Sequence, residues 1–302
     1  MNDAAQPADV KPLWRRIVDF PLVAMLIALV VVIVGITVST YVSADLPPIP
    51  GFSRNMMFAV ICAPVLIILY KLVIRHLGEH RRDDLRIEGA LRPLGIGLVA
   101  GVGVFTLIVI IAAALGIYHL TGEGDTKDLL PQLILSAIFP AISEEMIFRG
   151  ILFRWIEEFG GSWAALFLTS AFFGASHLAN PNASWVAAVG IAFEAGVMLG
   201  AAYMLTRSLW LAMGIHAAWN FTQGEVYDIP VSGMPVQGLL TARLSGPPLL
   251  TGNGFGLEAS LITIIVATIF GLWLLWLAVR KGELMRPRWT RRRRLSASPA
   301  AA

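Results

Sequence analysis

The feature that most constrains this chain is a series of long apolar runs separated by short polar segments. A bilayer core about 30 Å thick needs about 20 apolar residues for one helical crossing. Eight candidate runs span residues 20–43, 55–77, 94–118, 130–155, 162–178, 185–205, 209–221 and 257–279. Only 14% of the 302 residues are charged, too few to cover the surface of a soluble protein. The sequence therefore predicts an all-α polytopic membrane bundle with about eight transmembrane helices.

The first apolar run has a second interpretation, as a secretory signal peptide. Lys11, Arg15 and Arg16 form a basic segment before it, and the sequence at residues 42–44 resembles a cleavage site. The apolar stretch is longer than the roughly 7–15 residues typical of signal peptides. We therefore interpret this run as an uncleaved first transmembrane helix.

The distribution of Lys and Arg predicts the orientation of these helices. Basic residues in short loops favour the cytoplasmic side of a membrane. With the N-terminus inside, that side receives most of the Lys and Arg, including those of residues 71–92 and of the C-terminal tail. The other side receives only Arg54, Lys127 and Arg243. The pattern predicts that both termini are cytoplasmic, and we expect a protein of the bacterial inner membrane.

The chain divides into three predicted parts. Residues 1–129 hold three transmembrane helices and a basic cytoplasmic loop, 130–223 a central helical core, and 224–302 an outer loop, a final helix and a basic tail. The outer loop, residues 224–256, is rich in Gly and Pro, and we interpret it as a linker, with a lid as the alternative. Arg291–Arg294 are predicted to bind anionic lipid headgroups and not nucleic acid.

Charged side chains inside apolar runs are candidate functional residues, because each costs about 2.5–3.5 kcal/mol on insertion scales. The charged and titratable residues selected from these runs are Glu144, Glu145, Arg149, Glu194, His177 and His216. For Glu194 we predict buried pairing with Arg207 or with a histidine. Nothing in its sequence context assigns it a more specific role.

Helix geometry separates the two adjacent glutamates. Glu145 and Arg149 are four residues apart, so they share a helix face and can neutralise each other, whereas Glu144 points elsewhere. An unpaired carboxylate in an apolar, partly wet cavity suits a general base that activates water. The alternative is that the three charges form a single packing triad.

Two further pairs show the same four-residue spacing. His216 and Asn220 place two hydrogen-bond donors on one helix face, which suits stabilisation of an oxyanion, although alone they also fit interhelical polar contacts. Phe173 and His177 share a stripe, and alone His177 fits an ordinary helix-end histidine. Together with Glu144, the two histidines indicate hydrolytic chemistry.

In sequence order, these residues resemble the three motifs of the CPBP intramembrane endopeptidases, the Abi or CAAX-processing protease family. The motifs read Glu144-Glu145-Met146-Ile147-Phe148-Arg149, Phe173-x-x-x-His177 and His216-x-x-x-Asn220, on successive apolar runs. The resemblance covers about residues 132–222. It implies that the central part of the chain is a catalytic core.

The resemblance also implies a role for each motif residue. Glu144 corresponds to the water-activating base and His177 to the residue that positions the water. His216 and Asn220 correspond to the oxyanion site. Glu145 and Arg149, with Phe173, would support it. In this mechanism protonated Glu144 finally passes its proton to the leaving amine.

Metal dependence is a separate question, since the family was first described as metalloproteases. Glu144, His177 and His216 could in principle ligate zinc, which accepts nitrogen and carboxylate ligands. However, the sequence has no His-Glu-x-x-His helix, and these three ligands would come from three helices. The single Cys62 excludes a cysteine-cluster metal site. We expect no cofactor, with zinc as the alternative.

One geometric requirement accompanies this assignment. At 1.5 Å per residue, Glu144 and His216 lie near mid-depth of straight helices, but His177 lies near the outer end of the fifth run. The three must converge. Either the fifth helix starts deeper or continues past His177, or the motif is not assembled in three dimensions.

The sequence thus predicts an intramembrane endopeptidase that cleaves a peptide or a small membrane protein, with or without a lipid group. The alternative is a scaffold or bacteriocin-immunity-type binding protein that keeps the motifs for folding. The intact set Glu144, His177, His216 and Asn220 argues against it. A transporter would need a charged pathway and paired repeats, and neither is visible in the sequence.

Overall fold

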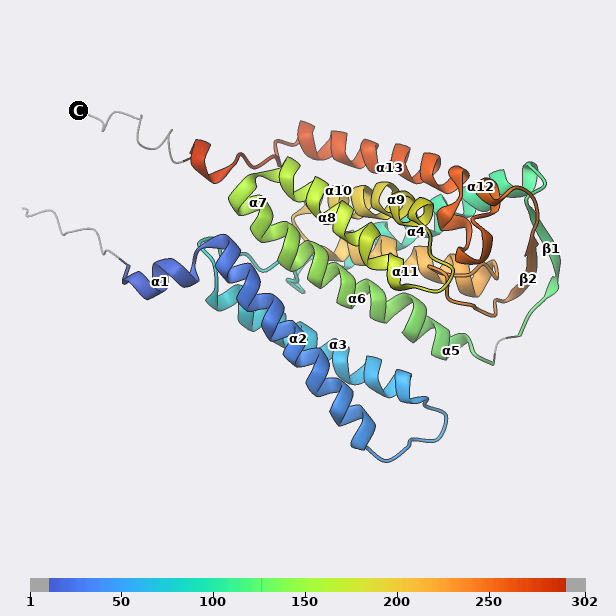
Figure 1. Ribbon diagram of the computed structural model, residues 1–302, viewed down its shortest axis with the longest axis horizontal. Coiled ribbons are helices and arrows are strands. Elements are labelled where there is room, and N and C mark those ends of the chain that lie inside the picture. The colour runs from blue at the N-terminus through green and yellow to red at the C-terminus, as the bar shows by residue number, and fades with distance from the viewer. Residues whose placement is uncertain (1–10, 126, 292–302) are drawn as a thin grey trace, which may run out of the picture.

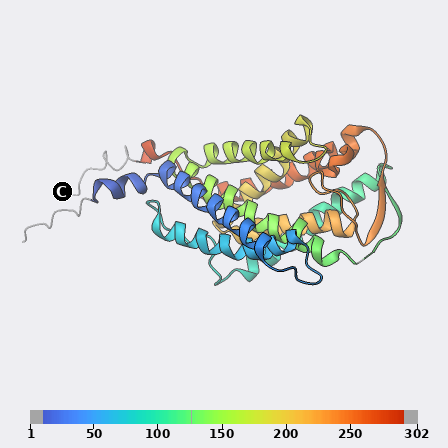
Figure 2. The same ribbon diagram turned by 60° about the horizontal axis from the view of Figure 1, so that its bottom comes forward.

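The computed structural model describes residues 11–125 and 127–291. The chain is an all-α polytopic bundle, as the sequence predicts, with a small two-stranded sheet at one end (Figure 1). Both ends of the described chain lie at the opposite end of the bundle from this sheet, in both views (Figures 1 and 2). An even number of membrane crossings would place both ends of the described chain on the same side.

The described N-terminal part consists of four helices, α1 (Leu13–Val18), α2 (Pro21–Asp45), α3 (Arg54–His76) and α4 (Leu91–Ala114). Helix α2 packs against α3, and α4 packs against the later helix α11 (Leu209–Phe221). The Ser53 hydroxyl caps α3 by accepting a hydrogen bond from the backbone N–H of Met56 at 3.2 Å. Helices α2 and α3 form an antiparallel hairpin along one side of the bundle (Figure 1).

The central part contains four longer helical segments, three of which include π-helical turns. The first runs through α5 (Leu129–Gln132), η1 (Leu133–Ile138), α6 (Phe139–Glu145), η2 (Met146–Phe153) and α7 (Arg154–Gly160). The second is α8 (Ser162–Ser176) with η3 (His177–Ala179), and the third is α9 (Trp185–Ile191), η4 (Ala192–Gly196) and α10 (Val197–Thr206). The fourth is α11 (Leu209–Phe221) with η5 (Thr222–Val226). Segments η1, η2, η4 and η5 are π-helical, a rare form that often occurs at functional sites.

Each predicted apolar run contains one of these helices or the last one, α13 (Leu261–Arg280). Among the described residues, six helical segments are long and apolar enough to cross a membrane. They are Pro21–Asp45, Arg54–His76, Leu91–Ala114, Leu129–Gly160, Trp185–Thr206 and Leu261–Arg280. Helices α8 and α11, with 15 and 13 residues, are shorter. Eight crossings therefore remain a prediction.

The outer loop contains a strand and short helices and is therefore not an irregular segment throughout. Its strand β2 (Leu240–Leu244) pairs antiparallel with β1 (Tyr118–Glu123), and it continues through α12 (Pro248–Thr251), η6 (Asn253–Phe255) and η7 (Leu257–Ala259). The glycines serve tight turns: Gly256 has φ 105°, and a Cβ there would clash with the carbonyl oxygen of Pro230. Helix α13 accordingly begins at Leu261, four residues after the start of the predicted run.

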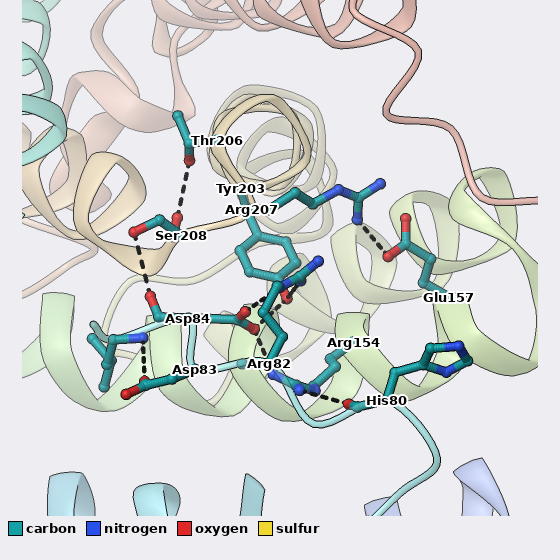
Figure 3. A network of polar contacts seen from close by, with 12 residues as sticks. His80, Arg82, Asp83, Asp84, Arg154, Glu157, Tyr203, Thr206, Arg207 and Ser208 are labelled. Atoms are coloured by element: carbon teal, nitrogen blue, oxygen red, sulfur yellow. Dashed lines mark hydrogen bonds and ion pairs between the residues drawn. The ribbon is translucent and has the colours of Figure 1, made fainter. Parts of the chain in front are cut away.

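A buried polar network fixes the loop between α3 and α4 to the core (Figure 3). The Asp84 carboxylate, fully buried, accepts hydrogen bonds from Arg82 at 2.5 Å, from Arg154 at 2.7 Å and from the Tyr203 hydroxyl at 2.7 Å. These partners lie on the same loop, on α7 and on α10. The network is remote from the outer loop and contains none of the motif residues.

Arg207 belongs to the same end of the molecule and does not pair with Glu194. Its guanidinium donates to Glu157 at 2.5 Å and to Glu283 at 3.1 Å, joining α7 to the segment after α13 (Figure 3 shows Arg207 and Glu157). The prediction of a Glu194–Arg207 pair is therefore wrong. Arg291 donates to the backbone oxygens of Arg286 and Glu158, whereas residues 292–294 of the basic tail lie outside the described residues.

A reporter protein fused after Ala302 is expected to be cytoplasmic, because Lys and Arg concentrate on the side that carries both chain ends. The measurement compares a reporter active only in the cytoplasm with one active only in the periplasm. A fusion within the outer loop, after Gln237, is the matched control and should give the opposite result. A periplasmic C-terminus would contradict the topology.

Candidate active site

A buried ion pair forms the base of the candidate site. Arg149 donates to Glu145 Oε1 at 2.8 Å, as their spacing predicts, and both side chains are fully enclosed. The Arg149 guanidinium also donates to the backbone oxygens of Ala195 at 3.0 Å and Gly196 at 3.3 Å. These carbonyls belong to the π-helical segment η4, where the regular hydrogen-bond ladder is interrupted. Arg149 thereby joins the first motif to the third long helical segment.

Glu145 holds a second partner that the sequence did not reveal. His216 Nδ1 donates to the same Oε1 atom at 2.9 Å, so the carboxylate bridges Arg149 and His216. With Nδ1 used in this way, Nε2 is the free nitrogen of the imidazole, and it lies 4.0 Å from Glu144 Oε2. Glu145, which pairs with Arg149, therefore also orients His216, a predicted oxyanion residue.

Glu144 and Glu145 point in different directions, as predicted. The Glu144 side chain is 32% exposed, whereas that of Glu145 is 0% exposed. Among the described residues, Glu144 Oε2 has no hydrogen-bond partner. The two adjacent carboxylates thus differ in environment: one is locked in an ion pair and the other is free to act on a mobile group. A single packing triad of all three charges is not formed.

His177 lies directly after the end of α8, where η3 begins, and its ring packs beside that of Phe173. Its Nδ1 donates to the Phe173 carbonyl oxygen at 2.7 Å, which leaves Nε2 unengaged. The Phe173 ring centre lies 4.9 Å from that of His177 and 6.3 Å from that of His216, and the Arg149 guanidinium sits 4.6 Å from the ring centre. Phe173 therefore separates the two imidazoles and the cation.

Asn220 is held by the π-helical segment η1. Its Nδ2 donates to the backbone oxygen of Ser136 at 2.7 Å, which leaves the second amide hydrogen available. The Ser136 hydroxyl in turn donates to the buried Glu225 carboxylate. A chain of contacts from Glu225 through Ser136 thus fixes the amide of Asn220.

Motif residues from two helical segments, α8 with η3 and α11, line a small cavity of about 20 Å³. Its walls include His177, His216 and Asn220, so two of the three residues that must converge, His177 and His216, share this cavity. A cavity needs about 10–15 Å³ to hold one water molecule, and the water needs 2–4 polar partners. The site has this volume and these partners. Glu144 does not form part of the wall, and no contact within 4.0 Å joins it to His177.

Ser232 of the outer loop and Glu258 of η7, just after this loop, supply part of the wall of this cavity. Glu258 Oε2 accepts hydrogen bonds from the Ser232 N–H at 2.6 Å and from its hydroxyl at 3.1 Å. Burial raises the pKa of the Glu258 carboxyl, and the hydrogen bonds from Ser232 and the neighbouring His177 oppose that change. Glu258 was not among the site residues predicted from the sequence. It falls at the start of the eighth apolar run, where charged residues are rare, and this position could have marked it as a candidate.

Glu194 lines the same cavity and is 1% exposed. Its Oε2 atom has no hydrogen-bond partner among the described residues. Glu194 therefore lines the same cavity as the two predicted catalytic histidines. The sequence predicted only that Glu194 would be buried and paired with Arg207 or a histidine.

The donor geometry bears on the zinc alternative. Among the described residues, the one group of three His, Cys, Asp or Glu whose ligand atoms lie within 4.8 Å of one another is Glu79, His80 and Glu158. This group lies near α7, away from the motif residues (Figure 3 shows His80). Glu144, His177 and His216 do not converge in this way. Zinc binding by these three residues stays an alternative prediction.

Comparison with known proteins identifies the central segment. Residues 126–222 match the family model described as type II CAAX prenyl endopeptidase Rce1-like. This segment is Rce1-like. It includes all three motifs, and the resemblance to the CAAX-processing proteases is confirmed over it. The curated proteins and the solved structures that were compared gave no match.

The Rce1-like segment occupies about a third of the chain and ends before the outer loop. It therefore includes Glu144, Glu194 and His216 but not Ser232 or Glu258, which complete the cavity. Together with the six long apolar helices, it identifies a multi-pass integral membrane protein.

Proposed function

We propose that this protein is an intramembrane endopeptidase of the CAAX-protease type, which hydrolyses a peptide bond with an activated water molecule. The observation that carries the proposal is the convergence of His177, from the end of α8, with His216 and Asn220, both from α11, at a water-sized cavity within an apolar bundle. The Rce1-like segment contains all three residues and supports the same reaction.

The proposed nucleophile is a water bound to His177. Because His177 Nδ1 donates to the Phe173 carbonyl, Nε2 carries a lone pair that can accept a hydrogen bond from the water. Glu144 then removes a proton from this water as it attacks the scissile carbonyl carbon. Its partial exposure and its lack of a hydrogen-bond partner leave this carboxylate free to move toward the substrate.

His216 and Asn220 are proposed to stabilise the negative oxygen of the tetrahedral intermediate. Asn220 has one amide hydrogen left after its bond to Ser136, and His216 would donate from Nε2. A donating Nε2 requires a protonated imidazole, whose positive charge would be balanced by Glu145 and Glu144 on either side. The oxyanion site would thus combine a cationic and a neutral donor.

The substrate class is proposed from the family description. A peptide that ends in a prenylated cysteine and three further residues is the appropriate probe. We expect the purified protein in lipid nanodiscs to release the last three residues from an internally quenched farnesylated peptide. The same peptide without the farnesyl group measures the contribution of the lipid. Absence of cleavage of the farnesylated peptide would contradict the proposed function.

Metal chelation is expected to leave this activity unchanged, because the proposed mechanism uses only side chains and water. The measurement is the cleavage rate after dialysis against 1,10-phenanthroline, then after addition of zinc. A zinc-dependent endopeptidase assayed under the same conditions is the control for effective chelation. Loss of activity that zinc restores would contradict the metal-free mechanism.

A further inference from the structure

We propose that Glu194 is the general acid that protonates the leaving amine, and that Glu258 is a positioning residue that keeps the proton on Glu194. This inference rests on the proposed function and adds a second carboxyl group to it. The sequence motifs do not include either residue, and Glu258 lies outside the Rce1-like segment.

The placement of the carboxyl groups around the cavity supports separate roles for Glu144 as general base and Glu194 as general acid. Glu194 and Glu258 line the cavity together with His177, His216 and Asn220, whereas Glu144 is not part of its wall. A group that donates a proton to the leaving nitrogen must lie within hydrogen-bond reach of it. The cavity wall therefore offers Glu194, and not Glu144, for this step.

The hydrogen bonds around the two carboxyl groups indicate where the proton resides. Glu258 accepts from both the N–H and the hydroxyl of Ser232, which stabilise the ionised form. Glu194 receives no hydrogen bond from the described residues and is almost completely enclosed. An unpaired charge in such a position is costly, so the proton belongs on Glu194. The Glu258 carboxylate lines the same cavity, and its negative charge disfavours a second charge on Glu194.

The local backbone explains why Glu194 points inward. Glu194 lies in the π-helical segment η4, whose extra residue per turn changes the direction of its side chains relative to a regular helix. Arg149 satisfies the carbonyl oxygens of Ala195 and Gly196 directly after it. The ion pair at the base of the site thus stabilises the backbone that presents Glu194.

The nearby histidines are less suitable proton donors. His177 uses Nδ1–H for the Phe173 carbonyl, and its Nε2 lone pair is needed to hold the water. His216 would have to keep its Nε2 proton in order to stabilise the oxyanion. Glu194 is the remaining group of the wall that can give up a proton without losing a role.

The protons balance through the cycle. Water adds to the carbonyl carbon while one of its protons passes to Glu144. The C–N bond then breaks as the Glu194 proton passes to nitrogen, which gives the free amine, and the carboxylic acid product forms. Transfer of the proton from Glu144 to Glu194, through the next water, restores the starting state.

Two matched substrates separate this role from a structural one. The first is the internally quenched farnesylated peptide, and the second is the same peptide with the scissile N–H replaced by sulfur. A thiolate leaves without prior protonation, whereas an amine does not, so loss of the general acid affects only the amide strongly. For Glu194→Gln, we expect amide kcat/KM to fall about 100-fold and thioester kcat/KM to fall less than about tenfold.

Glu225→Gln is the matched control, because Glu225 is also fully buried with an unpartnered Oε2 but does not line the cavity. It should change the two rates by the same factor. An equal fall of both rates in Glu194→Gln, or no fall in either, would overturn the proposal. Glu144→Gln should slow both substrates. If it slows neither, the proposed function itself fails, whatever the result for Glu194.

Discussion

Glu144→Gln is expected to reduce cleavage of the farnesylated peptide by about 10²–10⁴-fold, the usual contribution of a general base. The amide has the shape of the carboxylate but cannot accept a proton from water. Glu144 Oε2 makes no hydrogen bond in the described structure and lies 4.0 Å from His216 Nε2, so the substitution removes no native hydrogen bond of this atom. The variant should therefore be folded, and its thermal unfolding temperature should match that of the unmodified protein.

The measurement is kcat/KM on purified protein, with folded yield from size-exclusion chromatography. Glu123→Gln is the control, since Glu123 is exposed on β1 and lies far from the cavity. It should leave both activity and yield unchanged. Full activity in Glu144→Gln would end the enzymatic assignment.

Glu145→Gln is expected to act first on stability, by about 3–5 kcal/mol, because it leaves the buried Arg149 guanidinium without its counter-charge. It also changes the acceptor of His216 Nδ1, so activity should fall as well. The measurement is the free energy of unfolding in mixed micelles, followed by the assay on the folded fraction. The two adjacent glutamates would then differ, because Glu144→Gln would abolish catalysis and Glu145→Gln would destabilise the fold.

The double variant Glu145→Gln with Arg149→Met is the matched control for this interpretation. Replacing both members of a buried ion pair costs less than removing one, because no charge remains unpaired. The double variant should therefore recover part of the lost stability. A single variant as stable as the unmodified protein would contradict the role of the pair.

Much of the fold was predictable because each lipid-facing helix must be apolar along most of its length. The eight apolar runs each contain a helix, and the i, i+4 spacing correctly placed Glu145 against Arg149. The same spacing correctly turned Glu144 away from that pair. Local periodicity suffices for such statements, because both residues lie on one helix.

Contacts between distant segments were not predictable in this way. Nothing in the spacing indicated that Glu145 would bond His216, or that Arg149 would hold the backbone after Glu194. Arg149 lies in the π-helical segment η2 and its backbone acceptors lie in η4, and no pattern in the sequence signals these turns. The glycines of the outer loop suggested a linker because composition does not distinguish tight turns from disorder. Glu258 lies just after this loop, and it was not predicted as part of the site.

The small sheet has a consequence for biosynthesis. Strand β1 precedes the core helices and β2 follows them, so about 120 residues must be made before Tyr118 can pair with Leu244. Ser232 and Glu258 reach the cavity only once the ribosome has passed the end of the outer loop. During translation, the nascent chain would hold Glu144, His177 and His216 while its cavity lacked a wall. The timing of synthesis would thus delay hydrolytic activity until the last transmembrane helix is being made.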